Sequence, residues 1–296
     1  MHCEEELQAA DFELATPLLM SEFADQAKRL ETQGMLQFDE ENPAMIALVG
    51  IGEMGGVFAR AFLRAGHPVH PVVRTASPKK VAVSVPEPAL TLVTVGENDL
   101  TEALRALPES WRQRIGLIQN ELLPRDWIGA GLTDPTVIVV WFEKKPGKDV
   151  KVIIPSPVYG PAAGLVAEAL KKIDIPTKML STTADLEFEL VRKNLYILTA
   201  NIAGIITGGN VDSLWKNHRS LAQQVAYEVL LIQETLVENP LDSEALINAM
   251  VDAFEADPEH GATGRSAPIR LKRALAHAAK ANLKVPTLKS IDNKTV

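Results

Sequence analysis

The sequence predicts an α/β fold: a doubly wound parallel sheet followed by a mainly α-helical C-terminal domain. Three observations predict it. The apolar run 44–49 leads directly into a glycine-rich turn, and a helical pattern and a second apolar run, 69–73, follow within about 30 residues, the size of a βαβ unit. Strand-sized apolar runs then alternate with helical patterns up to residue 182, and only helical patterns follow from residue 183. This order is typical of an N-terminal Rossmann domain joined to a helical domain.

The remaining elements are expected from periodicity and from glycine and proline positions. Strands are expected at 90–95, 115–118, 137–142 and 150–154, and helices at 55–65, 99–107, 162–172, 184–206, 214–238, 242–254 and 269–282. We expect a rigid turn at 156–161 and no full crossover helix between residues 74 and 90, a stretch with three prolines. The chain is therefore divided into a polar N-terminal extension (1–43, with a candidate helix at 21–33), a Rossmann domain (44–182) and a helical C-terminal domain (183–296).

Composition excludes several classes of function. A net charge of −8 without a basic stripe argues against a nucleic-acid partner. The longest apolar stretches are strand-sized or interrupted, so no membrane span is expected. Cys3 is the only cysteine and the six histidines are scattered, so neither an internal disulfide nor a metal site is expected. The acidic N-terminus does not resemble a secretory signal, and we expect a cytoplasmic protein with a small-molecule substrate; a homodimer is left open.

The turn after the first strand has the pattern GxGxxG, in Gly50-Ile51-Gly52-Glu53-Met54-Gly55. Gly50 allows a tight turn, Gly52 lets the backbone approach a pyrophosphate, and Gly55 allows close packing of helix on strand. The N–H groups of the following helix favour a bound anion. These six residues are therefore predicted to bind a dinucleotide; the alternative is a tight turn without a ligand.

Arg74 indicates which dinucleotide is bound. It follows the second strand, where an NAD-binding protein usually carries Asp or Glu for the ribose hydroxyls. An arginine there can bind a 2′-phosphate through two hydrogen bonds, which predicts NADP(H). The alternative is a solvated surface arginine.

The long helix predicted at 184–206 carries a second candidate site. Lys193 and Asn201 are eight residues apart, slightly over two turns, and so lie on one broad face. Such a pair can donate hydrogen bonds to a substrate oxygen. Periodicity alone favours a solvent-facing lysine and a capping asparagine.

Residues 44–290 resemble the 2-dehydropantoate 2-reductase (ketopantoate reductase) family, within the group related to 6-phosphogluconate dehydrogenase. The resemblance rests on motifs in order: the glycine turn, Arg74, Thr94-Val95, the stretch Gln119-Asn120-Glu121 where the family has His-Asn-Gly, and Arg192-Lys193 followed by Asn201. It implies an NADPH-dependent reductase of 2-keto acids, with its active site in the cleft between the domains.

The resemblance also implies residue roles. Lys193 would be the general acid, and Asn120 would lie near the nicotinamide and position Lys193. Asn201 and Ser266 would bind substrate, and Val95 would contact the cofactor. The chain departs from the family pattern at three positions, with Gly96 for a lysine, Ile197 for an asparagine, and Ser266 for a substrate-binding glutamate. Arg265 or Arg270 could hold a substrate carboxylate instead, although a plain surface charge is the favoured interpretation of each.

The sequence therefore predicts an NADP(H)-dependent oxidoreductase that reduces a small 2-keto acid or a related carbonyl compound. Two alternatives stay open. The altered substrate residues and the N-terminal extension fit a non-catalytic NADP(H)-binding sensor or assembly protein. The third option is a dehydrogenase that oxidises a hydroxy acid or an imino compound.

Overall fold

The computed structural model describes residues 43–294. The expected N-terminal extension and its helix at 21–33 lie outside these residues. The sheet half contains seven strands that pair in the order β2-β1-β3-β4-β5-β8-β9. Their bounds are β1 Ile46–Val49, β2 Val69–Val72, β3 Leu90–Val93, β4 Ile115–Leu117, β5 Thr136–Ile138, β8 Ser156–Tyr159 and β9 Thr177–Met179. All neighbours run parallel except β5 and β8, so the predicted doubly wound sheet is present with one antiparallel step.

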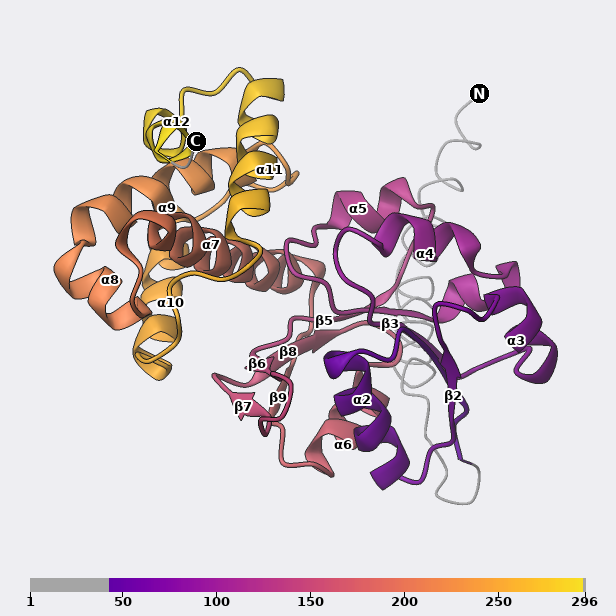
Figure 1. Ribbon diagram of the computed structural model, residues 1–296. Coiled ribbons are helices and arrows are strands. Elements are labelled where there is room, and N and C mark those ends of the chain that lie inside the picture. Colours follow the sequence, from indigo (N-terminus) through magenta and orange to yellow (C-terminus); the bar gives the residue numbers. More distant parts are fainter. Residues whose placement is uncertain (1–42, 295–296) are drawn as a thin grey trace, which may run out of the picture. The chain divides into compact units, whose positions relative to one another are not determined.

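Helices cover both faces of this sheet (Figure 1). The helices α2 (Glu53–Arg64) and α6 (Ala163–Lys171) pack together on one face, and α4 (Leu100–Ala106) and α5 (Pro124–Gly129) lie on the other. The apolar side chains of β1 and β3 are fully buried because both faces are covered. Between residues 74 and 90 there is one short helix, α3 (Pro78–Ser84), as the prolines there suggest. A 3-10 helix, η1 (Glu109–Arg114), leads into β4.

Strand order places the glycine turn where ligands bind in open α/β sheets. The strand β1 lies between β2 and β3, with Val49 opposite Val72 on one side and Val93 on the other. The helices after β1 and after β3 lie on opposite faces, which makes this the topological switch point. A crevice outside the carboxyl ends of these strands is therefore expected.

Three expectations about the sheet half are wrong. The apolar run 137–142 does not form one strand: β5 ends at Ile138, and Phe142 begins a separate hairpin of β6 (Phe142–Glu143) and β7 (Lys151–Val152). The segment 156–161 is not a turn, because β8 pairs with β5 through Val158 and Ile138. The strand β9 and the helix α5 were not expected. Such short elements, with prolines at or near their starts, have no clear period in the sequence.

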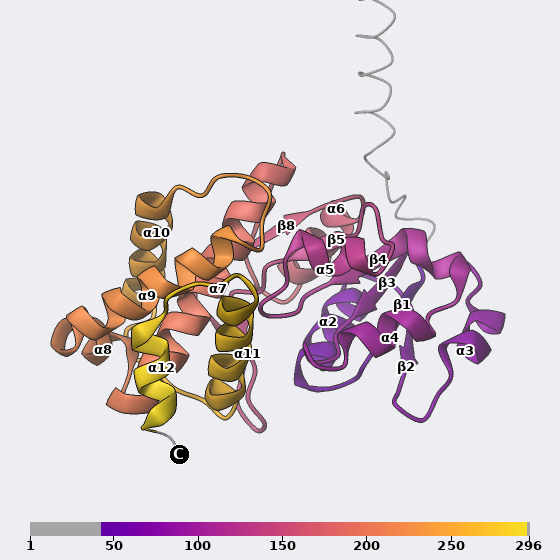
Figure 2. The same cartoon turned by 90° about the horizontal axis from the view of Figure 1, so that it is seen from above.

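The helical half is built around α7 (Thr183–Thr207), which packs against all the other helices of this half (Figure 2). Thr182 caps its first turn, accepting a hydrogen bond from the Asp185 backbone N–H, and Gly208 ends it with a φ of 60°. Its neighbours are α8 (Val211–Asn217), α9 (Arg219–Glu234), α10 (Ser243–Ala256), α11 (Ala267–Lys280) and α12 (Pro286–Asn293). The expected helix 214–238 is thus two helices, and α12 was not expected. None of the described helices is long and apolar enough to cross a membrane.

Candidate active site

The glycine turn has the geometry that each of its glycines predicts. Gly50 has a φ of 93°, which is accessible to glycine and strained for other residues. A Cβ on Gly55 would lie 2.3 Å from the Gly50 carbonyl oxygen, so only glycine fits where α2 meets β1. A Cβ on Gly52 would meet nothing within 4 Å, so the backbone there faces open space. Thr94 fixes the turn from β3, because its hydroxyl donates to the Gly50 carbonyl oxygen at 2.6 Å.

A pair of adjacent glycines in α2 makes this packing testable. We expect Gly55→Ala to lower the free energy of unfolding by about 1–3 kcal/mol, because the new methyl group must displace backbone. Gly56→Ala is the matched control: nothing lies within 4 Å of its Cβ, and alanine stabilises a helix interior by about 0.5–1 kcal/mol relative to glycine. Urea denaturation measures both, and equal effects would contradict the close approach at Gly55.

The start of α2 fits an anionic group. Gly52 is its N-cap and offers no side-chain hydrogen bond to the first turn, so the N–H groups there have no side-chain acceptor. Ile51, Gly52 and Glu53 are exposed, and Met54 is half-buried. The Glu53 carboxylate is 3.2 Å from the Lys144 ammonium group, which offsets its negative charge beside the helix terminus. The six residues of the turn thus form a cradle of the kind that holds a pyrophosphate.

Arg74 lies just beyond β2, at the same edge of the sheet as the glycine turn. Its side chain is 93% exposed, and its guanidinium group is 3.5 Å from the Asp99 carboxylate. Arg74 is therefore free to reorient toward a ligand, at the cost of a weak surface ion pair.

Val95, which is predicted to contact the cofactor, lies directly against the glycine turn. Its Cγ1 is 3.1 Å from where a Cβ of Gly50 would lie.

Lys193 is half-buried on α7, and its ammonium group lies 4.0 Å from the centre of the Trp141 ring. Tyr196, one turn further on, packs edge-on against Trp141 at 5.0 Å. Burial, then the positive charges of Arg270 and Arg192, lowers the pKa of Lys193 to about 7, against the opposing effect of Glu143. An amine with this pKa exchanges its proton readily at neutral pH, so the geometry suits a general acid or base.

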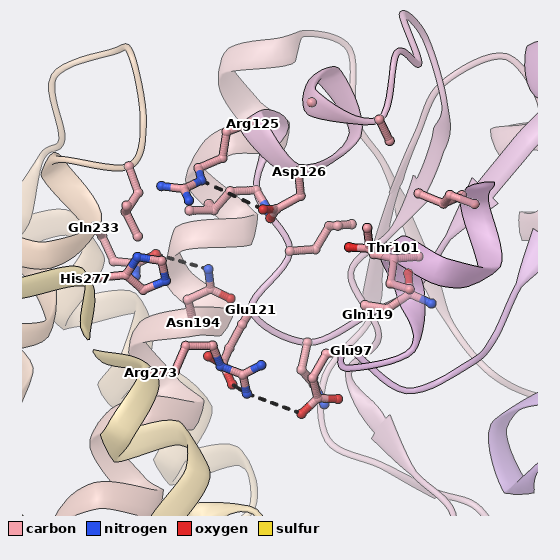
Figure 3. Close-up of a pocket in the computed structure, with 18 of the residues that line it drawn as sticks. Glu97, Thr101, Gln119, Glu121, Arg125, Asp126, Asn194, Gln233, Arg273 and His277 are labelled. Atoms are coloured by element: carbon pink, nitrogen blue, oxygen red, sulfur yellow. Dashed lines mark hydrogen bonds and ion pairs between the residues drawn. The ribbon is translucent and has the colours of Figure 1, made fainter. Parts of the chain in front are cut away.

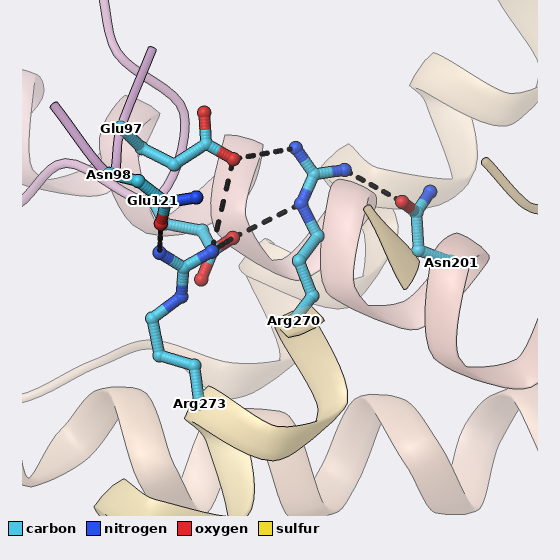
Figure 4. Close-up of polar contacts among 6 residues, drawn as sticks. All are labelled: Glu97, Asn98, Glu121, Asn201, Arg270 and Arg273. Carbon is cyan, nitrogen blue, oxygen red and sulfur yellow. Dashed lines mark hydrogen bonds and ion pairs between the residues drawn. The ribbon is translucent and has the colours of Figure 1, made fainter. Parts of the chain in front are cut away.

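Asn201 lies on the same helix and is buried. Its side-chain oxygen accepts a hydrogen bond of 2.6 Å from Arg270, a residue of α11 (Figure 4). The favoured interpretation of Arg270 as a plain surface charge is wrong, because only 9% of the residue is exposed. Arg265, in contrast, is exposed. Ser266 is the N-cap of α11, one turn before Arg270.

Glu121 is a member of this site that the sequence analysis passed over. Its carboxylate accepts hydrogen bonds from Arg270 at 3.1 Å and from Arg273 at 2.9 Å. The sequence did contain a signal for Glu121: it follows Asn120 directly, at a position where the resembled family has glycine. Arg270 therefore connects Asn201 of α7 with Glu121 of the loop after β4, and its charge acts on Lys193, whereas the glycine turn and Arg74 follow β1 and β2.

A cavity of about 630 Å³ lies between the sheet half and the helical half (Figure 3). Asn120 and Glu121 line it from the loop after β4, and Asn194 and His277 line it from α7 and α11. Of the predicted site residues, it contains Asn120 alone; Lys193, Asn201 and the glycine turn do not line it. Its volume is in the range of small-molecule sites. Within residues 43–294, no group of histidine, cysteine and carboxylate side chains is arranged to hold a metal ion.

No protein-family model and no curated protein sequence matches this chain. Solved structures do match it. A ketopantoate reductase of the PanE/ApbA family from Ralstonia eutropha is 16% identical, with a TM-score of 0.58 over 84% of this chain and 96% of that one. A dimeric ketopantoate reductase from Staphylococcus aureus is 13% identical, with a TM-score of 0.60 and the same coverage. A D-mandelate dehydrogenase in complex with NADH and anilino(oxo)acetate has the same identity, TM-score and coverage as the S. aureus protein. Residues 43–294 therefore have the fold of the ketopantoate reductases, at 13–16% sequence identity to the structures compared.

Proposed function

We propose that this protein is an NADP(H)-dependent oxidoreductase that reduces a small 2-oxo acid or a related carbonyl compound. One observation carries the proposal: a half-buried lysine with a pKa of about 7 lies within electrostatic reach of a buried arginine, which is hydrogen-bonded to an asparagine of the same helix as the lysine. A glycine cradle for a dinucleotide lies at the edge of the adjoining sheet. Structural neighbours described as ketopantoate reductases and as an NADH-bound D-mandelate dehydrogenase support the same class of reaction.

The residues of this chain would have separate roles in the reaction. The bound nicotinamide would supply the hydride. Lys193 would donate a proton to the carbonyl oxygen as negative charge develops there, and its ammonium charge would stabilise that oxygen. Asn201 would bind substrate, and Asn120 would position Lys193 and the nicotinamide. The face of the Trp141 ring would hold the Lys193 ammonium group in place and exclude water from the side of that group which it covers.

The direct test is oxidation of NADPH in the presence of a panel of 2-oxo acids and neutral ketones. We expect turnover of at least one 2-oxo acid that depends on Lys193. If no carbonyl compound is reduced at any pH, the proposal fails.

We further propose that Arg74 selects NADP(H) over NAD(H). Arg74→Ala is expected to weaken NADPH binding by about ten- to a hundredfold, because hydrogen bonds to a charged group are lost. NADH binding should change little, since NADH has no 2′-phosphate. Arg60→Ala, which removes an exposed arginine of α2, is the control. Calorimetric titration with both cofactors measures this, and equal losses for the two would contradict the role of Arg74.

The cleft also supports a second function, a non-catalytic NADP(H) sensor. Arg270 already binds Asn201 and Glu121, so these three side chains satisfy one another without a substrate. This function predicts that NADPH raises the melting temperature while no carbonyl compound is turned over. A dehydrogenase working in the oxidative direction would instead reduce NADP⁺ in the presence of hydroxy acids.

The dimeric S. aureus protein supports a homodimer for this chain as well. Light scattering on the purified protein should then give twice the mass of the 32.2 kDa chain. A monomer at assay concentrations would contradict this expectation.

A further inference from the structure

Two arginines of α11 connect the helical half to the sheet half (Figure 4). Arg270 and Arg273 are three residues apart and therefore lie on one face of α11. Both reach the loops that follow β3 and β4. Arg273 donates to Asn98 at 3.2 Å and to Glu121 at 2.9 Å, and Arg270 lies 3.5 Å from Glu97. Glu121 accepts hydrogen bonds from both arginines, and Glu97 lies within ion-pair distance of both, 3.5 Å from Arg270 and 3.8 Å from Arg273.

The backbone of Glu121 is in the left-handed region, with a φ of 60°. A residue with a Cβ costs roughly 1–2 kcal/mol there, whereas glycine does not. Its side chain is only 13% exposed, and burial raises the pKa of its carboxyl group against the effect of the two guanidinium groups. The chain therefore tolerates both backbone strain and desolvation to hold this carboxylate between the arginines. Strain of this kind is concentrated at functional sites.

Arg270 is the arginine placed to meet a substrate. Its guanidinium group binds Asn201, on the same broad face of α7 as Lys193, and its charge lowers the pKa of Lys193. In a 2-oxo acid, the carboxylate carbon is bonded directly to the carbonyl carbon. If the carbonyl oxygen met Lys193, the adjacent carboxylate would need a second cation nearby, and Arg270 is the first of the two arginines whose charge acts on Lys193. Arg273 has no bond to Asn201 and instead lines the 630 Å³ cavity.

We propose that Arg270 binds the carboxylate of the substrate. In the free protein the Glu121 carboxylate is bound to Arg270 instead, and the carboxylate of an incoming 2-oxo acid displaces it. The identity of the ligand rests on the proposed function. On displacement, Glu121 keeps its bond to Arg273, so it is not left buried without a counter-charge. One carboxylate replaces another on Arg270, and the number of ion pairs is conserved. A neutral ketone has no carboxylate to replace that of Glu121 on Arg270, so this exchange favours acids over neutral ketones.

The test is calorimetric titration with oxamate, a 2-oxo-acid analogue that is not reduced, with neutral oxamide as the comparison ligand. Glu121→Gln is expected to bind oxamate about tenfold or more tightly than the wild type, because the competing charge is gone. Glu121→Gly should do the same and should also fold well, because glycine suits a φ of 60°. Arg270→Gln is expected to lose about tenfold or more in oxamate affinity, and Arg270→Lys should lie between it and the wild type. Oxamide binding should not follow this order.

Glu87→Gln is the control for the loss of one negative charge. Among residues 43–294, Glu87 pairs with Arg114, 3.6 Å away, and it precedes β3, at the end of the strand opposite to the loop that carries Glu97. It should leave oxamate affinity unchanged.

Three results would overturn the inference: unchanged or weaker oxamate binding in both Glu121 variants, wild-type affinity in Arg270→Gln, or no binding by the wild type and the Glu121 variants. Oxamate binding needs no turnover, and the titration is run both with and without NADPH, so that the order in which the two ligands bind does not affect the result. A protein that binds oxamate in the expected order but reduces nothing would contradict the proposed function alone. A protein that reduces 2-oxo acids with the reverse order of affinities would contradict this inference alone.

Discussion

Replacing Lys193 with alanine is expected to lower kcat for reduction by about 100- to 10,000-fold, the usual contribution of a positioned general acid. The reason is local. Lys193 places an ammonium group in the cleft, 4.0 Å from the Trp141 ring, and a methyl group there can neither donate a proton nor stabilise negative charge on the substrate oxygen. Steady-state oxidation of NADPH measures the loss.

Chemical rescue separates this role from damage to the fold. Truncation leaves space beside the Trp141 ring, whose face attracts cations, so added methylammonium should restore part of the rate. Lys216→Ala is the control, because Lys216 is exposed on α8 and its ion pair is with Asp212 of the same helix. Equal rates for the wild type and Lys193→Ala on every active substrate would remove Lys193 from the mechanism.

The second large effect is on pH dependence. Reduction requires the protonated form of Lys193, and its pKa is about 7. We therefore expect kcat/KM for the oxo acid to be level below pH 7 and to fall about tenfold for each pH unit above it. The oxidative reaction requires the neutral amine, so its rate should rise with pH and level off above 7.

Two neighbours of Lys193 should move this profile in opposite directions. Arg192 lowers the pKa of Lys193 by charge repulsion, and Glu143 raises it. Arg192→Gln should therefore shift the falling limb to higher pH, and Glu143→Gln should shift it to lower pH. If the limb does not move in either variant, a group other than Lys193 controls the pH dependence.

Much of the fold could be predicted because its signals are local. The strand–turn–helix around Gly50 and Gly55 depends on a short apolar run, a GxGxxG turn and a helical period, all within 25 residues. The elements β1, α2, β2, β3 and α7 begin and end within a few residues of the bounds that the sequence predicts for them. The elements that were not expected, among them β8, β9 and α5, are short and depend on their neighbours. Val158 is in a strand because β5 supplies its hydrogen-bonding partner.

The sequence by itself determined the parallel strands β1 to β4, the glycine turn and the helix that carries Lys193 and Asn201, because periodicity and glycine geometry act over a few residues. Only the tertiary structure decided which charged side chains of α11 and of the loop after β4 come together. Arg270 and Glu121 are 149 residues apart in the chain. Nothing local to either indicates that α11 brings a buried guanidinium group against a strained carboxylate at the end of β4. The same contact placed Arg270 within electrostatic reach of Lys193. The pKa of that lysine is thus a property of packing and charge across the two halves of the molecule.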